Sequence, residues 1–419
     1  MHSFQALPEW VTLEHEVATI LTQQEIHGWY FNQEAAREFE LDLREELQTI
    51  TQALERRYPN VPGVEFTPKR DNKTRGYVAG ATFTKLKDLN PYSRDHLAWI
   101  LTTYDGFDPN GTLTKSGKLV IDETTLKNHG TGLALEMLRV LEIGKMLGMI
   151  SEGANAWQKL CTSASRIHHH CSVATSTHRC AHRSPNLGQV PSDERARRLF
   201  IPTPGQVMVG ADLSGIELRM LSHYLARYDT YFGDNLLNGD IHQANADKIG
   251  ITRKLVKNVT YAFLYGAGDV KIGLTYDPLL SNARAKSKGK EIREAFIAAI
   301  PGLSDLLAAT KAASDRGFVK AIDGRKIKLS SPHVALNYLL QGSAGVIAKR
   351  WMTIAHANPF CCNQLAFVHD ELQYECDPEH AESLKFKLEL SAVEAGEFYN
   401  LRIPIAAEGK IGSSWADVH

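Results

Sequence analysis

Residues 207–221, VMVGADLSGIELRML, constrain the fold more than any other stretch of the chain. Apolar and small residues run up to Asp212 without interruption, which is typical of a buried strand, and the spacing then changes to that of a helix carrying Glu217 near its start. A lone aspartate at the end of a strand most often caps a helix or forms a turn, so Asp212 by itself indicates no particular chemistry. The segment predicts a strand over residues 206–212 that leads directly into a helix.

A second acidic position lies between the two β-rich runs of NQLAFVHDELQYEC, where Asp370 and Glu371 are adjacent. An Asp-Glu pair is also common at hairpin turns that have no chemical role. If this hairpin and the strand before Asp212 belong to one sheet, however, their carboxylates converge and repel one another. Divalent cations are the usual means of keeping such acids ionised, and two Mg2+ ions held by carboxylates are the arrangement used for phosphoryl transfer. Convergence would therefore create a site for two Mg2+ ions.

The segment TRKLVKNVTYAFLY predicts a helix for which Thr252 is a suitable N-cap. Arg253, Lys257, Tyr261 and Tyr265 recur at every fourth position, so they share one helix face. Two cations one turn apart suit a triphosphate, and an aromatic ring one turn further suits a base and sugar stacked above it. An amphipathic helix with an exposed basic edge explains the same spacing equally well.

The remaining chain reads as mainly helical, with apolar residues at three- and four-residue intervals. The expected elements are helices over 11–27, 33–57, 93–104, 126–149 and 332–357, a loop-rich basic insertion over 58–91, two short strands within 166–183, and a hairpin over 321–329 with Asp323 and Gly324 at its turn.

The charge balance argues against a strongly basic nucleic-acid-binding protein, and the cysteine content argues against a disulfide-stabilised one. The 47 basic and 48 acidic residues nearly cancel, so a nucleic-acid surface would have to come from local clusters, each of which can equally be a solvated face. Such clusters are Lys69, Arg70, Lys73 and Arg75; Arg284, Lys286, Lys288 and Lys290; and Arg325, Lys326 and Lys328. Six scattered cysteines indicate no disulfide framework, and no leader or run of about 18 apolar residues is present. We expect a cytoplasmic protein without a membrane segment.

The segment RIHHHCSVATSTHRCAHR, residues 166–183, concentrates histidine and cysteine and raises the question of a zinc site. Structural zinc sites usually show paired ligands at short, regular spacing, and no two such pairs occur here, so the pattern argues against zinc. Its alternation indicates two short strands around a polar turn, and its arginines could lie along a nucleic-acid backbone.

Three ordered motifs carry a resemblance to a known family. DLSGIELRMLSHYLARYD, RKLVKNVTYAFLYGAG and FVHDELQYEC resemble motifs A, B and C of the family A DNA polymerases, the DNA polymerase I family. LNGDIH, IDGRK, SPHVALNYLLQGSAG and the closing EGKIGSSWADVH are similar most of all to the replicative polymerases of short-tailed bacteriophages. The resemblance covers nearly the whole chain.

The resemblance implies roles for individual residues. Asp212 and Asp370 would hold the two Mg2+ ions with help from the backbone carbonyl of Leu213, with Glu371 as an auxiliary acid. Lys257 would both grip the triphosphate and donate a proton to the leaving pyrophosphate. The implied nucleotide-binding residues are Arg253, Lys257, Tyr261, His242, Tyr265 and Glu217, the last as a steric gate against a 2′-hydroxyl. The expected DNA-binding residues are Arg179, Gln341, His369 and Arg325.

The family also implies an architecture: an α+β, right-hand polymerase fold with an antiparallel-sheet palm, helical fingers and a helical thumb. The expected domains are a thumb over residues 1–165 with its insertion over 58–91, palm over 166–229 and 323–419, and fingers over 230–322. Two positions depart from the family pattern. His178 replaces the glycine of Thr-Gly-Arg, which puts the shape of the primer-side loop in question, and Ala262 replaces a glycine where only local packing should change.

The implied function is a template-directed DNA polymerase that extends a primer 3′-hydroxyl with dNTPs on primer–template DNA, in phage DNA replication. The chain begins where the thumb should begin, so we expect no 3′–5′ exonuclease domain, and a separate exonuclease chain would have to supply any proofreading. The insertion occupies the place of a thioredoxin-binding loop in one phage relative, but it is short, which argues against thioredoxin as a partner.

Two alternatives have to be weighed against this reading. A single-subunit RNA polymerase shares the architecture, but Glu217 as a gate against ribose argues against it. An idle, polymerase-like DNA-binding subunit would have no need of Asp212, Asp370, Arg253 and Lys257.

Overall fold

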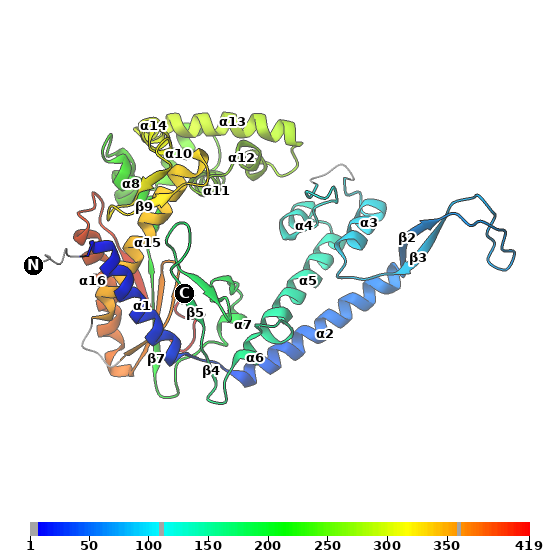
Figure 1. Ribbon diagram of the computed structural model, residues 1–419, viewed down its shortest axis with the longest axis horizontal. Coiled ribbons are helices and arrows are strands. Elements are labelled where there is room, and N and C mark those ends of the chain that lie inside the picture. The colour runs from blue at the N-terminus through cyan, green and yellow to red at the C-terminus, as the bar shows by residue number, and fades with distance from the viewer. Residues whose placement is uncertain (1–6, 109–112, 358–361) are drawn as a thin grey trace, which may run out of the picture. The chain divides into compact units, whose positions relative to one another are not determined.

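The computed structural model describes residues 7–108, 113–357 and 362–419, and the chain forms two compact units (Figure 1). Residues 1–35 and 157–419 make up the larger unit, and residues 36–156 the smaller one. Helices are combined with small antiparallel sheets, so the predicted α+β class is confirmed.

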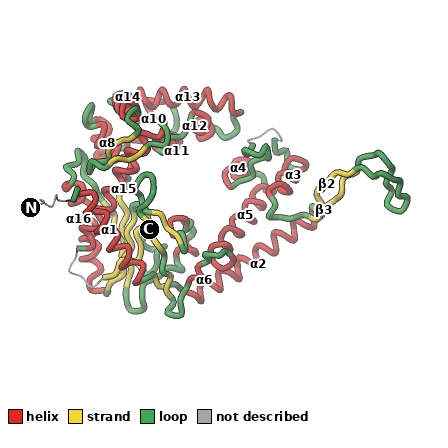
Figure 2. The backbone as a smooth tube through the Cα atoms, in the orientation of Figure 1, coloured by secondary structure: helices red, strands yellow, loops and turns green. Residues whose placement is uncertain are grey.

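A four-stranded antiparallel sheet forms the centre of the larger unit (Figure 2). In spatial order its strands are β10 (Cys362–Val368), β11 (Glu371–Cys376), β7 (Val207–Leu213) and β12 (Ala407–Gly412). Every residue of β11 is buried, as is most of β7, because these inner strands are covered by neighbours on both edges. The predicted strand before Asp212 and the predicted hairpin around Asp370 therefore belong to one sheet.

Two helices pack on this sheet, α1 (Glu9–His27) and α16 (Ala381–Phe398), and α15 (Ala335–His356) packs on both of them. Trp351 of α15 is fully buried, and its indole N–H donates a hydrogen bond of 2.8 Å to the carbonyl of Leu388 in α16. Burial of a large aromatic body with its one polar atom satisfied is a strongly stabilising arrangement. The helices expected over 11–27 and 332–357 are confirmed.

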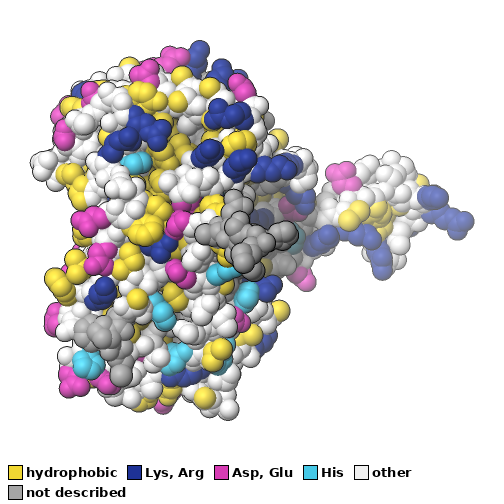
Figure 3. Space-filling view, turned by 60° about the vertical axis from the view of Figure 1, so that its left-hand side comes forward, with side chains coloured by type: hydrophobic (Ala, Val, Ile, Leu, Met, Phe, Trp, Pro, Cys, Tyr) yellow, Lys and Arg dark blue, Asp and Glu magenta, His cyan; other side chains and the backbone are white. Residues whose placement is uncertain are grey.

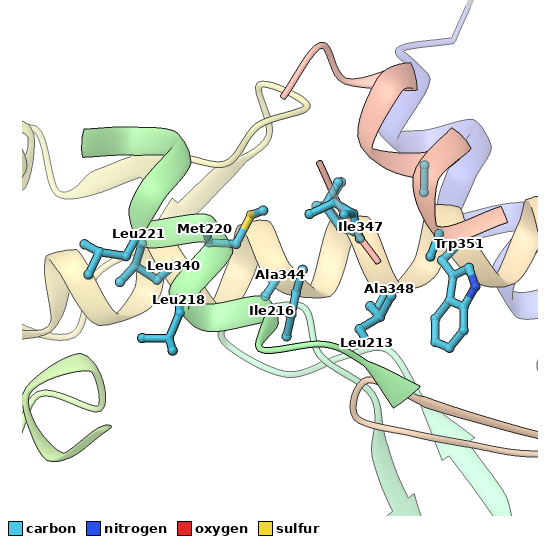
Figure 4. Packing of buried hydrophobic residues seen from close by; sticks show 14 of the residues in the cluster. Leu213, Ile216, Leu218, Met220, Leu221, Leu340, Ala344, Ile347, Ala348 and Trp351 are labelled. Carbon is cyan, nitrogen blue, oxygen red and sulfur yellow. The ribbon is translucent and has the colours of Figure 1, made fainter. Parts of the chain in front are cut away.

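The helix α8 (Ile216–Leu225) follows β7 and packs its apolar side on α15. Figure 4 shows Leu221 next to Leu340, and Ile216 next to Ala344. Since this packing anchors α8 along the whole contact, it holds Glu217 close to the end of β7.

A helical region follows between α8 and the second part of the sheet. It consists of α9 (Tyr231–Asn238), α10 (Ile241–Ile249), α11 (Arg253–Leu264), α12 (Asp269–Tyr276), α13 (Asn282–Ala299) and α14 (Leu303–Ser314). Gly273 and Gly289 let α12 and α13 approach so closely that a Cβ atom at either position would overlap backbone atoms of the other helix. The predicted hairpin is confirmed as β8 (Phe318–Lys320) and β9 (Lys326–Lys328), with Gly324 at positive φ in the turn.

The smaller unit is built on α2 (Gln33–Arg57) and α5 (Gly132–Leu147). Arg139 of α5 donates two hydrogen bonds, of 2.6 and 2.7 Å, to Glu46 of α2, a bidentate geometry that favours arginine. The unit also contains α3 (Arg94–Tyr104), α4 (Glu123–His129), the strands β2 (Asn60–Phe66) and β3 (Phe83–Asp88), and a π-helical turn (Gly148–Glu152) after α5.

Two expectations for this unit were wrong in detail. The single helix expected over 126–149 is divided into α4 and α5, because Gly130 takes a φ of 68° at the end of α4 and the Thr131 side chain caps α5. The insertion over 58–91 is not only loop: β2 and β3 pair as an antiparallel hairpin. Most residues of both strands are exposed or half-buried, so their sequence lacks the alternation by which strands are predicted.

The first 35 residues belong to the sheet-containing unit, because α1 packs on α15 and β10. The smaller unit thus spans less of the chain than the thumb range of 1–165 expected from the sequence.

The described helices show little potential to span a membrane. None of them is by itself long and apolar enough to cross a bilayer, and only α13 and α14 taken together, with a bend of 108° between them, reach that composition.

Candidate active site

Strand register brings the predicted acids together at one end of the sheet. Asp212 on β7 lies directly opposite Glu371 on β11 and Glu408 on β12. The backbone N–H of Leu213 donates a hydrogen bond of 3.0 Å to the carbonyl oxygen of Asp370, which fastens the hairpin turn to the end of β7. Asp212 stays exposed to solvent there, and Asp370 is half-buried.

The electrostatics of these acids are unfavourable in the metal-free chain. Partial loss of hydration, together with repulsion from Asp370 and Glu371, raises the pKa of Asp212 to about 7. The pKa of Asp370 rises to about 6 through burial and the nearby charge of Glu217, although Arg179 opposes this shift. Two oxygen-donor carboxylates that are costly to ionise together, one of them open to solvent, fit the requirements of a divalent cation such as Mg2+.

Glu371 is engaged by the chain itself. Its buried carboxylate accepts a hydrogen bond of 2.6 Å from the indole N–H of Trp415, lies 3.1 Å from Nδ1 of His419, and is also bonded by Gln373. The expected auxiliary acid therefore has protein partners on both oxygens. Sequence reasoning did not identify Trp415 and His419 as partners of Glu371. The closing segment EGKIGSSWADVH resembles the family, but this resemblance assigns no role to either residue.

Glu217 connects the strand end to the helical region. Its carboxylate accepts hydrogen bonds from Nη2 of Arg179 at 2.6 Å and from the hydroxyl of Tyr265 at 3.0 Å. Burial and the charge of Glu217 raise the pKa of Tyr265 to about 12. The pKa of Tyr261 is also raised, by burial and then by Glu217 and Asp370. Tyr261 of α11 and Tyr265, the residue that follows the helix, thus lie close to the acids.

The first turn of α11 presents the predicted cations. Thr252 caps the helix, as expected, by accepting a hydrogen bond from the N–H of Leu255. Arg253 and Lys257 are exposed, and Lys and Arg side chains are frequent on the upper part of the face in Figure 3. The guanidinium of Arg253 is paired with Asp240 at 2.6 Å, a partner that the sequence did not suggest.

His242 lies beside this turn of α11. Its ring is buried, and its centroid is 6.4 Å from that of Tyr261. Burial lowers its pKa, and the charges of Arg253 and Lys257 lower it further, while Asp240 opposes them. Four of the residues assigned to the nucleotide, namely His242, Arg253, Lys257 and Tyr261, are therefore gathered in one place.

The loop that carries Arg179 packs on α15. A Cβ added at Gly345 would lie 3.5 Å from the side chain of Arg179, so the loop is in ordinary van der Waals contact with α15, and Gln341 of α15 is half-buried. At Gly342 an added Cβ would clash with Cδ1 of Ile327, at 2.2 Å, so this glycine lets β9 pack closely on α15. His369 has a φ of 60° in the turn between β10 and β11, and partial desolvation and the charge of Arg179 lower its pKa.

His178 occupies a backbone conformation that favours glycine. Its φ is 59°, and its N–H bonds the carbonyl of Thr175 in a tight turn. This explains the departure from Thr-Gly-Arg: the turn keeps the left-handed geometry while carrying a side chain at a cost on the order of 1 kcal/mol.

A substitution series at His178 tests this interpretation. We expect His178→Gly to be at least as stable as His178→Ala, and His178→Val to be less stable than His178→Ala by about 1–2 kcal/mol, because a β-branched side chain fits positive φ poorly. Urea unfolding of the three variants measures the differences. Equal stability of the valine and glycine variants would show that the turn does not require this conformation.

The structure corrects the role expected for Arg325. It was expected to contact DNA, but its side chain is almost completely buried, with Nε bonded to Asp323 at 2.6 Å and Nη1 paired with Glu14 of α1. Lys349 of α15 donates to both oxygens of the same Glu14 at 2.7 Å. Arg325 therefore belongs to a buried ion network that fastens α1, and a guanidinium held in this way is not available to a phosphate backbone.

Comparison with known proteins adds an independent finding. The family model described as DNA polymerase family A matches residues 69–417. The chain is 30% identical to the DNA-directed DNA polymerase of Escherichia phage T7 and 29% identical to that of Enterobacteria phage T3, in each case over 98% of this chain and 70% of the relative. The polymerase domain of Pol1 from M. smegmatis, solved in complex with DNA primer-template and dNTP, is similar in fold, with a TM-score of 0.77 at 19% identity over 97% of this chain and 70% of that chain.

Proposed function

Since the chain belongs to DNA polymerase family A and is a DNA-directed DNA polymerase, we propose that it extends a primer 3′-hydroxyl by adding dNTPs, with two Mg2+ ions held by Asp212 and Asp370. The observation that carries this proposal is the strand register, which sets both acids at one sheet end although they are distant in the sequence. When bound, Mg2+ would favour ionisation of the 3′-hydroxyl and neutralise charge on the phosphates. The backbone carbonyl of Leu213 would assist the carboxylates.

The nucleotide would lie along α11. Arg253, Lys257 and His242 would contact the triphosphate, since the two exposed cations lie close to His242 at the start of α11. Lys257 would also deliver a proton to the departing pyrophosphate. Tyr261 and Tyr265 would lie against the sugar and the bases, and the pKa shifts that link both rings to Glu217 support this placement.

The primer end would be held by Arg179, Gln341 and His369, on the loop, helix and turn that border Asp370. Arg179 is already paired with Glu217 and influences the pKa of Asp370, which supports a position at the junction of primer and nucleotide. Glu371 would act mainly through Trp415 and His419, by holding the end of the chain against the strand that carries it.

The sheet, the helices α9–α14 and the unit of residues 36–156 would correspond to palm, fingers and thumb. The similarity to the polymerases of phages T3 and T7 supports a role in phage DNA replication, in the cytoplasm of a bacterial host.

Primer extension tests the proposal. A labelled primer on a DNA template is incubated with Mg2+ and with either deoxynucleotides or ribonucleotides, and Asp212→Ala serves as the control. Extension by deoxynucleotides alone, lost in the variant, is the expected result. Extension mainly by ribonucleotides would indicate an RNA polymerase, and tight DNA binding without extension would contradict the proposed activity.

Glu217 gives a sharper prediction about sugar selection. We expect Glu217→Ala to raise ribonucleotide incorporation relative to deoxynucleotide incorporation by about 10- to 100-fold, because truncation opens space for a 2′-hydroxyl. Tyr265→Phe is the matched control: it removes the hydrogen bond to Glu217 while the carboxylate stays. Single-nucleotide insertion kinetics measure both ratios. If the two variants change the ratio equally, the gate is the hydrogen-bonded pair rather than Glu217.

A further inference from the structure

A second cluster of metal-ligating side chains lies in the His-rich segment, outside the proposed polymerase site. The strand β5 (His170–Ser172) pairs with β6 (Ala181–Arg183), and Cys171 is directly opposite His182. Side chains two residues apart on an extended chain share a face, which brings His169 to the same side. One ligand atom from each of the three residues lies within 4.8 Å of the others, and all three residues are buried.

The three side chains of the cluster are connected by short contacts, two of which run through the amide of Gln24. Sγ of Cys171 is 3.2 Å from Nδ1 of His182, and Gln24 of α1 places its amide nitrogen 3.1 Å from Nε2 of His169 and 3.5 Å from the same sulfur. Gln364 donates to the other end of the Gln24 amide at 2.8 Å, so this amide is oriented with its N–H groups toward the cluster.

Not every ring nitrogen of these histidines has a hydrogen-bond partner. Among the described residues, Nδ1 of His169 and Nε2 of His182 have no hydrogen-bond partner, although both rings are at least nine-tenths buried. The contacts within the cluster are made by the opposite nitrogens, Nε2 of His169 and Nδ1 of His182, so these two are the nitrogens available as metal ligands, while the unpartnered ones would carry the ring N–H.

We propose that His169, Cys171 and His182 bind one Zn2+ ion, with the fourth position taken by water. Two imidazoles and a thiolate are a ligand set that zinc prefers, whereas Mg2+ prefers oxygen. In a tetrahedral zinc site neighbouring ligand atoms are roughly 3.3–3.6 Å apart, which small side-chain rotations reach from the distances present. Binding replaces the thiol proton of Cys171, which leaves to solvent, with a bond from sulfur to zinc.

The place of the cluster indicates its role. Gln24 belongs to α1, and the ring of His182 contacts the ring of His369 edge to face, at a centroid distance of 6.3 Å. The ion would thus cross-link the two strands of the β5–β6 hairpin, next to Gln24 of α1 and to the turn that carries His369 and Asp370. The zinc site does not depend on the proposed polymerase reaction, because His169, Cys171 and His182 have no assigned role in that reaction.

Metal analysis of the untagged chain, purified from zinc-supplemented cells and desalted, tests the proposal. We expect about one zinc per chain in the wild type and at least a tenfold loss of zinc affinity in Cys171→Ser. Cys180→Ser is the matched control, since Cys180 is buried in the same segment but outside the cluster. The double variant His168→Ala, His170→Ala should keep its zinc, which separates the buried cluster from the two more accessible histidines.

A spectroscopic measurement on the wild type removes dependence on how well the variants fold. Co2+ added to the chelator-treated chain should give a thiolate-to-cobalt charge-transfer band and the intense visible bands of four-coordinate cobalt, and added Zn2+ should abolish them. A wild-type chain without zinc and without these bands would overturn the proposal, and so would zinc retained in Cys171→Ser. Zinc lost only in the His168, His170 variant would show an adventitious surface site.

Discussion

Asp370→Asn is expected to lower the rate of primer extension by at least about 10³-fold, while the affinity for primer–template DNA changes little. The reason is that an amide cannot supply the negative charge that holds a divalent cation, and loss of one preorganised charge in phosphoryl transfer has effects of this order. Single-turnover extension and an equilibrium DNA-binding measurement check the two halves. A variant that still extends at more than a tenth of the wild-type rate would remove Asp370 from the proposed metal site.

The same variant should be more stable than the wild type when divalent cations are absent. The pKa values of Asp212 and Asp370 are raised above the unfolded value of 3.8, so in each case the folded state favours the protonated acid. Their ionisation therefore destabilises the folded chain progressively as pH rises from about 4 to 7. The stability gained by Asp370→Asn should be small at pH 5 and larger at pH 8, and Mg2+ should reduce it, as thermal unfolding would show. A gain independent of pH would mean that repulsion between the acids is not its source.

Glu14→Ala is expected to produce the largest loss of stability, about 3–5 kcal/mol in the free energy of unfolding. Glu14 is the shared anionic partner of Lys349 and Arg325, both almost fully buried, so its removal leaves the Lys349 cation buried without this partner, while Arg325 keeps Asp323. Burial by itself would raise the pKa of Glu14, but the attraction and hydrogen bonds of Lys349 and Arg325 outweigh it, and the net pKa is lowered.

Glu16→Ala is the matched control for this experiment. Glu16 lies on the same helix and pairs with Arg350 at 3.5 Å near the surface, so its loss should cost less than about 1 kcal/mol. Because the pKa of Glu14 is depressed, its contribution should be present above pH 4.5 and disappear as pH falls through the lower, folded-state pKa. Urea unfolding of both variants at pH 7 and at low pH measures this. Similar losses for the two variants would contradict a buried network.

Local patterns predicted much of this molecule correctly. The strand before Asp212, the cap at Thr252, the turn at Asp323 and Gly324, and the strand pair in the His-rich segment all follow from side-chain periodicity and turn chemistry. These features are set by residues that lie within a few positions of one another in the chain, so they can be predicted from the sequence alone. Errors arose where a single residue broke a longer pattern, as at Gly130, or where a hairpin had no buried face, as over residues 58–91.

The sequence by itself determined which residue types are available for chemistry: two acids at strand ends, a cationic and aromatic helix face, and a segment rich in histidine and cysteine. Only the tertiary structure decided how these groups are used. It removed Arg325 from the surface by pairing it with Glu14, engaged Glu371 through the C-terminal residues, and gathered His169, Cys171 and His182 across a strand pair. The physical reason is that burial and charge pairing depend on segments that are remote along the chain. The residues next to a carboxylate, guanidinium or imidazole in the sequence do not indicate which group will pair with it in the folded protein.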